Sequence, residues 1–392
     1  MINLNISRWW NAQPKKFSDA YNPRSNAFGF LRLCLASLVI VSHAYPLGGK
    51  YGTEILSKLS HGQENLGSVA VIGFFILSGF LIAGSYDHLK SMPRFLWHRF
   101  LRIMPGFWVS LAVVAVGFGS IFYYHYHHSL SGFLNLAADG PISFIINNFF
   151  LVIRQFEISN LSAQLIYPGA FNGSLWTLAY EFFCYLIIGT LGTVGILKKK
   201  RYLTLVLFIS VYALYSFNIA APDAAAGLIR PLKSLEFLKL ITAFLAGAAV
   251  YVFQDRLKLS SRIFLLSILT LLVAIYFGGL LILEVPLLTY ILMYLAAYLP
   301  IRSFDRKIDL SYGVYIYAFP VQQTFSLFGL NNLNIAVYCV LALAATLPLA
   351  FLSYVAIERP AMKLKNLQVK SNILSIFNPR LLRKRKAIAA RS

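Results

Sequence analysis

The stretch "FLRLCLASLVIVSHAY", residues 30–45, is apolar enough to cross a membrane, yet it carries Arg32 near one end and His43 near the other. In a helix the eleven-residue spacing corresponds to about three turns and ~16 Å along the axis, so both side chains share one face. A charged side chain at membrane depth is costly and usually faces the protein interior or a polar cavity. This stretch therefore predicts a membrane helix whose polar stripe faces the inside of a bundle.

The whole chain has the composition of a polytopic membrane protein. Of its 392 residues 58% are hydrophobic and only 12% are charged, and the mean hydropathy is +0.67. These values lie outside the range of soluble globular domains. Runs of about 20 apolar residues predict ten spanning helices, at residues 28–46, 66–86, 103–123, 174–196, 202–220, 236–254, 263–277, 279–299, 309–328 and 335–356. The expected fold is an all-α membrane protein, a bundle of about ten transmembrane helices.

The basic residues predict the topology. If the N-terminus is cytoplasmic, 28 of the 35 Lys and Arg residues fall on inner segments and 6 on outer segments, and Arg32 lies inside the first span. By the positive-inside rule both termini are then cytoplasmic. Because these residues are spread over many loops, the net charge of +21 does not indicate a nucleic-acid-binding protein.

The same pattern divides the chain into three regions. We expect a cytoplasmic N-terminal segment at 1–27, a transmembrane domain at 28–358 and a basic cytoplasmic tail at 359–392. The tail alternates apolar and basic residues, which is typical of a segment that rests on anionic lipid headgroups.

One predicted outer loop, residues 124–173, is long enough to suggest a function. Within it "ISFIINNFFLVI", residues 142–153, is apolar for only twelve residues, which is too short to span the bilayer. We interpret this stretch as interfacial or re-entrant, and as a candidate lid.

Several classes of site are not indicated. His125, His127 and His128 in "YYHYHH" could begin a metal site, but no second cluster supplies a convincing fourth ligand, so we predict no metal. The chain also has no phosphate-cradling glycine loop, HExxH or GxSxG. This argues against an ATP-driven transporter core, a zinc protease of that class and an α/β-hydrolase.

Further polar residues lie at or near membrane depth. Arg99 and Arg102, at i and i+3 on the cytoplasmic end of the third span, form a fork suited to phosphate oxygens. The alternative is that they are ordinary basic residues of a cytoplasmic loop, as the positive-inside rule expects. Glu181 lies about seven residues inside the outer end of the fourth span, where a carboxylate needs a partner. Because His43 is also placed in the outer half, a Glu181–His43 pair is geometrically permitted.

Arg32 and His43 each have a structural alternative. Arg32 is close enough to the inner boundary to snorkel to the headgroups, and His43 could be a merely hydrogen-bonded histidine. The chemical interpretation of His43 is that a neutral imidazole can take a proton from a hydroxyl and return it to a leaving group.

These residues occur in motifs that resemble the membrane acyltransferase-3 family through nearly the whole chain. In chain order the motifs are Arg-x10-His at Arg32 and His43, "GFFILSGFLI" at 73–82, Arg-x-x-Arg at Arg99 and Arg102, Trp-x-Leu-x-x-Glu at Trp176, Leu178 and Glu181, "LSYGVYIYAFPVQQ" at 310–323 and "IERP" at 357–360. Two departures concern the acceptor side: the entry to the second span is more apolar than usual, and Ala318 stands where a histidine is common.

The resemblance implies an O-acyltransferase with about ten spans in a bacterial cytoplasmic (inner) membrane. It implies an acyl-CoA co-substrate, most often acetyl-CoA, no tightly bound cofactor, and a carbohydrate acceptor such as an exopolysaccharide, an O-antigen or a lipid-linked repeat. The donor phosphates would lie near Arg99 and Arg102, and the pantetheine arm would pass Arg32 and reach His43.

Glu181 would support the imidazole of His43 as the second catalytic residue. We also predict that Trp176 and Ser78 contact the substrate. The alternatives are that Trp176 is an interfacial belt residue and that Ser78 serves helix packing.

Two rival functions remain open from the sequence. Intramembrane Arg, His and Glu also mark the routes of transporters, here of a glycolipid or an acidic solute. A transporter of that kind predicts broken helices in matching halves, which the sequence does not show. A non-catalytic membrane scaffold would leave Arg32, His43 and Glu181 replaceable.

Overall fold

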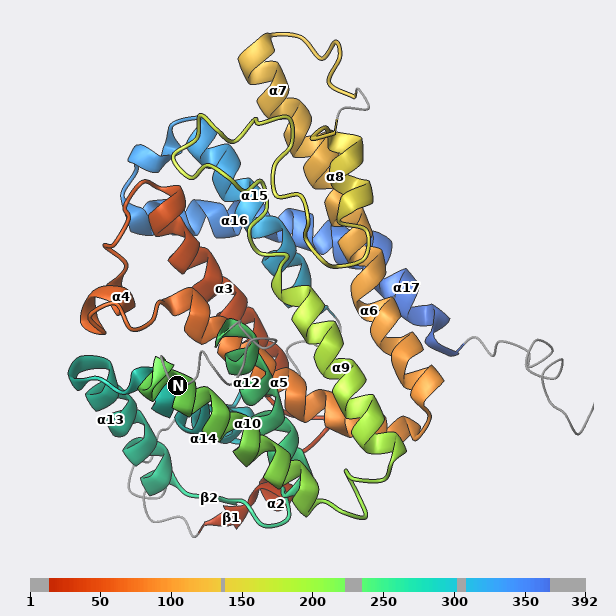
Figure 1. The fold of residues 1–392 in the computed structure, drawn as a ribbon, viewed down its shortest axis with the longest axis vertical. Coiled ribbons are helices and arrows are strands. Elements are labelled where there is room, and N and C mark those ends of the chain that lie inside the picture. Colours follow the sequence, from red (N-terminus) through yellow and green to blue (C-terminus); the bar gives the residue numbers. More distant parts are fainter. Residues whose placement is uncertain (1–13, 135–137, 223–234, 302–307, 367–392) are drawn as a thin grey trace, which may run out of the picture.

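The computed structural model describes residues 14–134, 138–222, 235–301 and 308–366, and this part of the chain is mostly helical (Figure 1). The long helices are α3 (Phe28–Leu47), α5 (Leu66–Leu89), α6 (Met92–Ala112) continued by η1 (Val113–Phe118) and α7 (Gly119–His127), α9 (Thr177–Thr193), α10 (Tyr202–Ala220), α12 (Leu235–Val252), α13 (Ser261–Phe277), α14 (Leu280–Tyr298), α15 (Ser311–Leu327), and α16 (Ile335–Ser353) continued by η4 (Tyr354–Glu358) and α17 (Arg359–Lys363). The short elements are β1 (Lys15–Lys16), α2 (Phe17–Ala20), α4 (Ile55–Leu59), α8 (Pro141–Asn147), β2 (Lys258–Leu259), η3 (Leu330–Asn332) and η5 (Leu364–Asn366).

The helices support a multi-pass membrane protein. Among the described residues seven helical runs are long and apolar enough to cross a membrane, and α9 and α13 are apolar helices of 17 residues each. The mainly helical fold is confirmed, with one short two-stranded ladder, whereas the count of ten spans and the cytoplasmic termini stay predictions. Residues 1–13 of the predicted N-terminal segment and 367–392 of the predicted tail lie outside the described residues.

Helix α5 lies at the centre of the bundle and packs against α3, α9 and, most extensively, α12. Gly79 and Gly247 make the closest approach: a Cβ atom on Gly79 would lie 1.9 Å from the carbonyl oxygen of Phe244, and one on Gly247 would lie 1.9 Å from that of Ile76. The two backbones therefore touch, as small residues allow in membrane bundles. This fixes α5 between α12 and α3.

A two-residue turn separates α13 from α14. Gly278 and Gly279 have φ angles of 105° and 88°, in the region that L-residues rarely adopt. The predicted boundary between these two spans is therefore confirmed, and the turn makes the helices antiparallel neighbours.

The N-terminal segment is tied to one end of the bundle. Lys15 pairs with Leu259 and Lys16 with Lys258 in an antiparallel ladder between β1 and β2. Figure 1 shows these strands and α2 at the opposite end of the molecule from α7 and α8. Two segments that the charge distribution places on the same side of the membrane thus meet.

The contact between α5 and α12 generates a stability prediction. We expect Gly79→Ala to destabilise the protein by about 1–3 kcal/mol, because the added methyl group forces two touching backbones apart. The measurement is thermal unfolding of the purified protein in detergent.

Gly117→Ala is the matched control, since its added Cβ would meet its nearest side chain at an ordinary 3.8 Å. Equal unfolding temperatures for the two variants would contradict the assigned contact.

Candidate functional site

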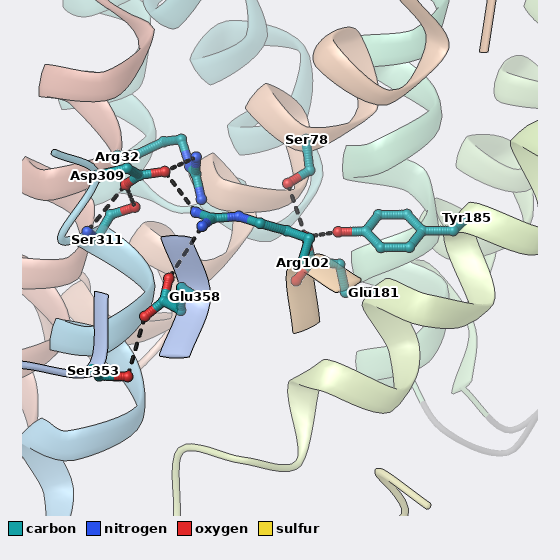
Figure 2. A network of polar contacts seen from close by, with 9 residues as sticks. All are labelled: Arg32, Ser78, Arg102, Glu181, Tyr185, Asp309, Ser311, Ser353 and Glu358. Atoms are coloured by element: carbon teal, nitrogen blue, oxygen red, sulfur yellow. Dashed lines mark hydrogen bonds and ion pairs between the residues drawn. The ribbon is translucent and has the colours of Figure 1, made fainter. Parts of the chain in front are cut away.

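A chain of ion pairs links four segments that are distant in the sequence (Figure 2). The Oδ2 atom of Asp309, just before α15, lies 2.9 Å from Nη1 of Arg32 on α3 and 2.5 Å from Nη2 of Arg102 on α6. Nη1 of Arg102 lies 3.1 Å from Oε2 of Glu358 in η4. Arg32 therefore faces the bundle interior, as predicted from its helix face, and it is not a snorkelling residue.

The network balances two cations with two carboxylates. Ser311 donates its hydroxyl to Oδ1 of Asp309 over 2.7 Å, and Ser353 donates to Oε1 of Glu358 over 3.2 Å. Charges at membrane depth are tolerated when they are paired and hydrogen-bonded. Glu358 lies in a turn of π-helix, a local widening that often occurs at functional sites.

Arg99 and Arg102 have different partners, so they do not form one fork in this structure. Arg102 is engaged by two carboxylates. Arg99 donates to Ser85 over 3.4 Å, and its guanidinium lies 5.9 Å from the ring centre of Tyr185. Its buried Nε has no hydrogen-bond partner in the described part of the chain. Arg102 thus has carboxylate partners, whereas Arg99 has none within ion-pair distance among the described residues. The contact of these arginines with a donor phosphate stays a prediction.

In the structure Glu181 is hydrogen-bonded to Ser78 and Tyr185, and not to His43 as expected. Its Oε1 accepts hydrogen bonds from Tyr185 over 2.6 Å and from Ser78 over 3.2 Å (Figure 2). Helix α9 begins at Thr177, after the buried residue Leu175, and Glu181 lies four residues into it. Its side chain lines the same cavity as Arg32 and Ser78, whereas His43 lines another.

Two cavities follow the polar face of α3. The inner one, of about 40 Å³, is lined by Arg32, Ser78 and Glu181. The outer one, of about 260 Å³, is lined by His43 and Trp176. Ser78 and Trp176, both predicted to contact substrate, thus belong to different cavities.

The two cavities meet at a common wall formed by Val71 and Tyr315. The hydroxyl of Tyr315 lies 2.6 Å from the Thr177 hydroxyl, and its ring packs edge-on against Phe74. Arg32 and His43, on one helix, therefore line two separate cavities that have Tyr315 and Val71 between them.

His43 is available for proton transfer. Its ring packs edge-on against Phe319, with 5.2 Å between the ring centres, and its buried Nδ1 has no hydrogen-bond partner among the described residues. The buried hydroxyl of Ser174 in the same cavity is likewise unpaired within the described chain. A base and a hydroxyl donor thus line one open space.

Four residues of the site were not predicted from the sequence: Asp309, Glu358, Tyr185 and Tyr315. A usable signal existed, because an arginine inside a membrane needs a counter-ion and the chain has only 14 acidic residues. Asp309 stands at the start of a predicted span, and Glu358 lies within the quoted "IERP" motif. Tyr315 carried no signal beyond its place in the block at 310–323.

Comparison with known proteins identifies the family of the chain. The chain matches the family model described as an acyltransferase domain, that of the acyltransferase-3 family, over residues 26–355. It is 30% identical over 345 residues to an O-acetyl transferase of Shigella phage Sf6, covering 85% of this chain and 94% of that protein. It is 26% identical over 371 residues to Nodulation protein 10 of Rhizobium leguminosarum bv. viciae, covering 87% and 94%. No solved structure matches significantly. The chain therefore belongs to the acyltransferase-3 family and is an acyltransferase.

Proposed function

We propose that this protein is an integral-membrane O-acyltransferase that moves an acetyl group from cytoplasmic acetyl-CoA to a hydroxyl of an extracytoplasmic carbohydrate. The observation that carries the proposal is the pair of adjoining cavities along α3, with Arg32 in the inner one and His43 in the outer one. A relative named as an O-acetyl transferase supports the choice of acyl group.

The donor enters from the end of the bundle that carries the cations. Arg32 and Arg102 are already balanced by Asp309 and Glu358. Arg99 is therefore the cation that contacts a donor phosphate most directly, while Arg32 and Arg102 shape the entrance. The thin pantetheine arm then follows α3 toward His43, and Tyr315 leaves its hydrogen bond with Thr177 as the arm passes.

The chemistry is acyl transfer from a thioester to an alcohol. His43 removes the proton of the acceptor hydroxyl as that oxygen attacks the thioester carbonyl, and a tetrahedral intermediate forms. The hydroxyl of Ser174 can donate to the developing oxyanion. The C–S bond then breaks, and the imidazolium returns its proton to the sulfur of CoA.

Glu181 acts on the donor side of this route. Its carboxylate lies on the inner cavity and is held by Ser78 and Tyr185. It is a positioning residue that orients the arm's polar groups or the neighbouring cations, and Trp176 remains in place to stack on a sugar ring beside His43.

The proposed setting is a bacterial cytoplasmic membrane with both termini inside. The distribution of 28 inner against 6 outer basic residues supports this orientation. The rival transporter predicts broken helices at the site, whereas α3 and α5 run unbroken through it.

The direct test is chemical. In cells that carry this protein, mass spectrometry of released glycans will show O-acetyl groups that disappear when the protein is removed and return when it is restored. Unchanged acetylation in all three strains would contradict the proposed function.

His43→Ala will lower acetyl transfer by at least 10²-fold, because general base catalysis contributes about 10²–10⁴-fold to such reactions. The measurement is transfer of labelled acetate from acetyl-CoA by purified protein in lipid discs. His125→Ala on α7 is the control, and thermal unfolding shows that both variants are folded. Transfer by the His43 variant at the wild-type rate would remove His43 from the mechanism.

Asp309→Asn will destabilise the protein by about 2–4 kcal/mol, since it leaves two arginines with one carboxylate between them. Combining it with Arg102→Gln will recover part of that loss, because the second change removes the uncompensated charge. Thermal unfolding of the two single variants and the double variant measures the coupling. Additive effects would show that the two residues do not depend on each other.

A further inference from the structure

A third cavity, of about 350 Å³, adjoins the His43 cavity on the side away from Arg32. Three residues line both cavities, so the two cavities are direct neighbours: Asn65, Ser68 and Glu236. Its volume is in the range of pockets that hold small molecules. Nothing in the proposed transfer step uses this cavity.

The charges on its walls are arranged around one ammonium group. Nζ of Lys239 lies 2.7 Å from Oε1 of Glu64, 3.0 Å from Oγ of Ser68 and 3.1 Å from Oε1 of Glu236. The side chains of Lys239 and Glu64 are 5% and 4% exposed, whereas that of Glu236 is 50% exposed. The described wall thus presents one carboxylate more than it has ammonium groups.

All three donors of Lys239 are in use. An ammonium group has three N–H donors and no acceptor, and Glu64, Ser68 and Glu236 account for them. Lys239 is therefore not free to bind a carboxylate or phosphate on a ligand. The accessible oxygens of Glu236, in contrast, can accept hydrogen bonds from a ligand's hydroxyl groups.

A buried hydroxyl group also points to a ligand. Tyr215 on α10 has no exposed surface, it lines this cavity, and its hydroxyl has no hydrogen-bond partner within the described residues. A buried hydroxyl without a hydrogen-bond partner destabilises the protein, and a ligand that hydrogen-bonds to this hydroxyl would offset that cost.

Resting on the proposed function, we infer that this cavity is a subsite for the acceptor and that it binds an uncharged sugar adjacent to the one acetylated in the His43 cavity. Glu236 and Tyr215 hydrogen-bond the hydroxyls of that sugar. The excess carboxylate, together with the occupied ammonium of Lys239, disfavours a uronic acid or a phosphorylated sugar there.

The first test identifies the natural acceptor. Membranes that contain the protein are given acetyl-CoA with a labelled acetyl group, and the labelled glycan is released and sequenced by mass spectrometry. We expect the acetylated sugar to have a neighbour without carboxylate, phosphate or sulfate. An acetylated sugar with acidic neighbours only would overturn the inference.

The second test uses variants of the cavity wall. Unacetylated glycan extracted from cells lacking the protein serves as the acceptor, at varied concentration, for purified protein. Glu236→Gln and Tyr215→Phe should each raise the apparent KM for this glycan about three- to tenfold, the usual effect of losing one hydrogen bond. For Tyr215→Phe the KM for acetyl-CoA and the hydrolysis of acetyl-CoA without acceptor should not change, because Tyr215 does not line the His43 cavity.

Matched controls make the same chemical changes elsewhere. Asp255→Asn alters a carboxylate paired with Arg201. Tyr212 is on the same helix as Tyr215, and Tyr212→Phe removes a hydroxyl that donates to the backbone carbonyl of Ile282. If the wild-type protein transfers acetate and the cavity variants behave like the controls, the acceptor subsite is wrong. If the wild-type protein transfers no acetate to any glycan, the proposed function itself fails.

Discussion

The ion pairs of Asp309 with Arg32 and Arg102 are the constraint on which the rest of the site depends. They join α3, α6 and the start of α15, and Glu358 extends the connection to η4. Because Arg32 must reach Asp309, α3 can adopt only one rotation about its axis within the bundle. Eleven residues later the same rotation turns His43 toward the outer cavity. The orientation of His43 is thus set by a charge interaction about three helical turns away.

Features that depend on a single helix could be predicted from the sequence. Apolar length located α3, α5 and α14 to within a few residues, and the helical period placed Arg32 and His43 on one face. The second span also contains Gly79, whose backbone contacts α12 directly. The family motifs then indicated the reaction class, which the comparisons support.

Features that depend on how helices are placed relative to one another could not be predicted. Asp309 is 277 positions from Arg32 and 207 from Arg102, and periodicity carries no information over such separations. Glu181 was considered as a partner of His43 because both were expected in the outer half of the membrane, whereas the two side chains line different cavities. Lys239 and Glu64 are separated by 175 positions, so their buried ion pair could not be predicted from the sequence either.

The wall at Tyr315 matters for the bilayer as well as for the substrate. A route that let a thioester arm cross most of a membrane would, if it stayed open, also conduct protons and dissipate the gradient across it. In the proposed mechanism, the narrow inner cavity and the hydrogen bond between Tyr315 and Thr177 keep that route closed at rest. The arm itself would fill the space whenever the tyrosine moves aside, so that catalysis and electrical insulation are compatible in one helix bundle.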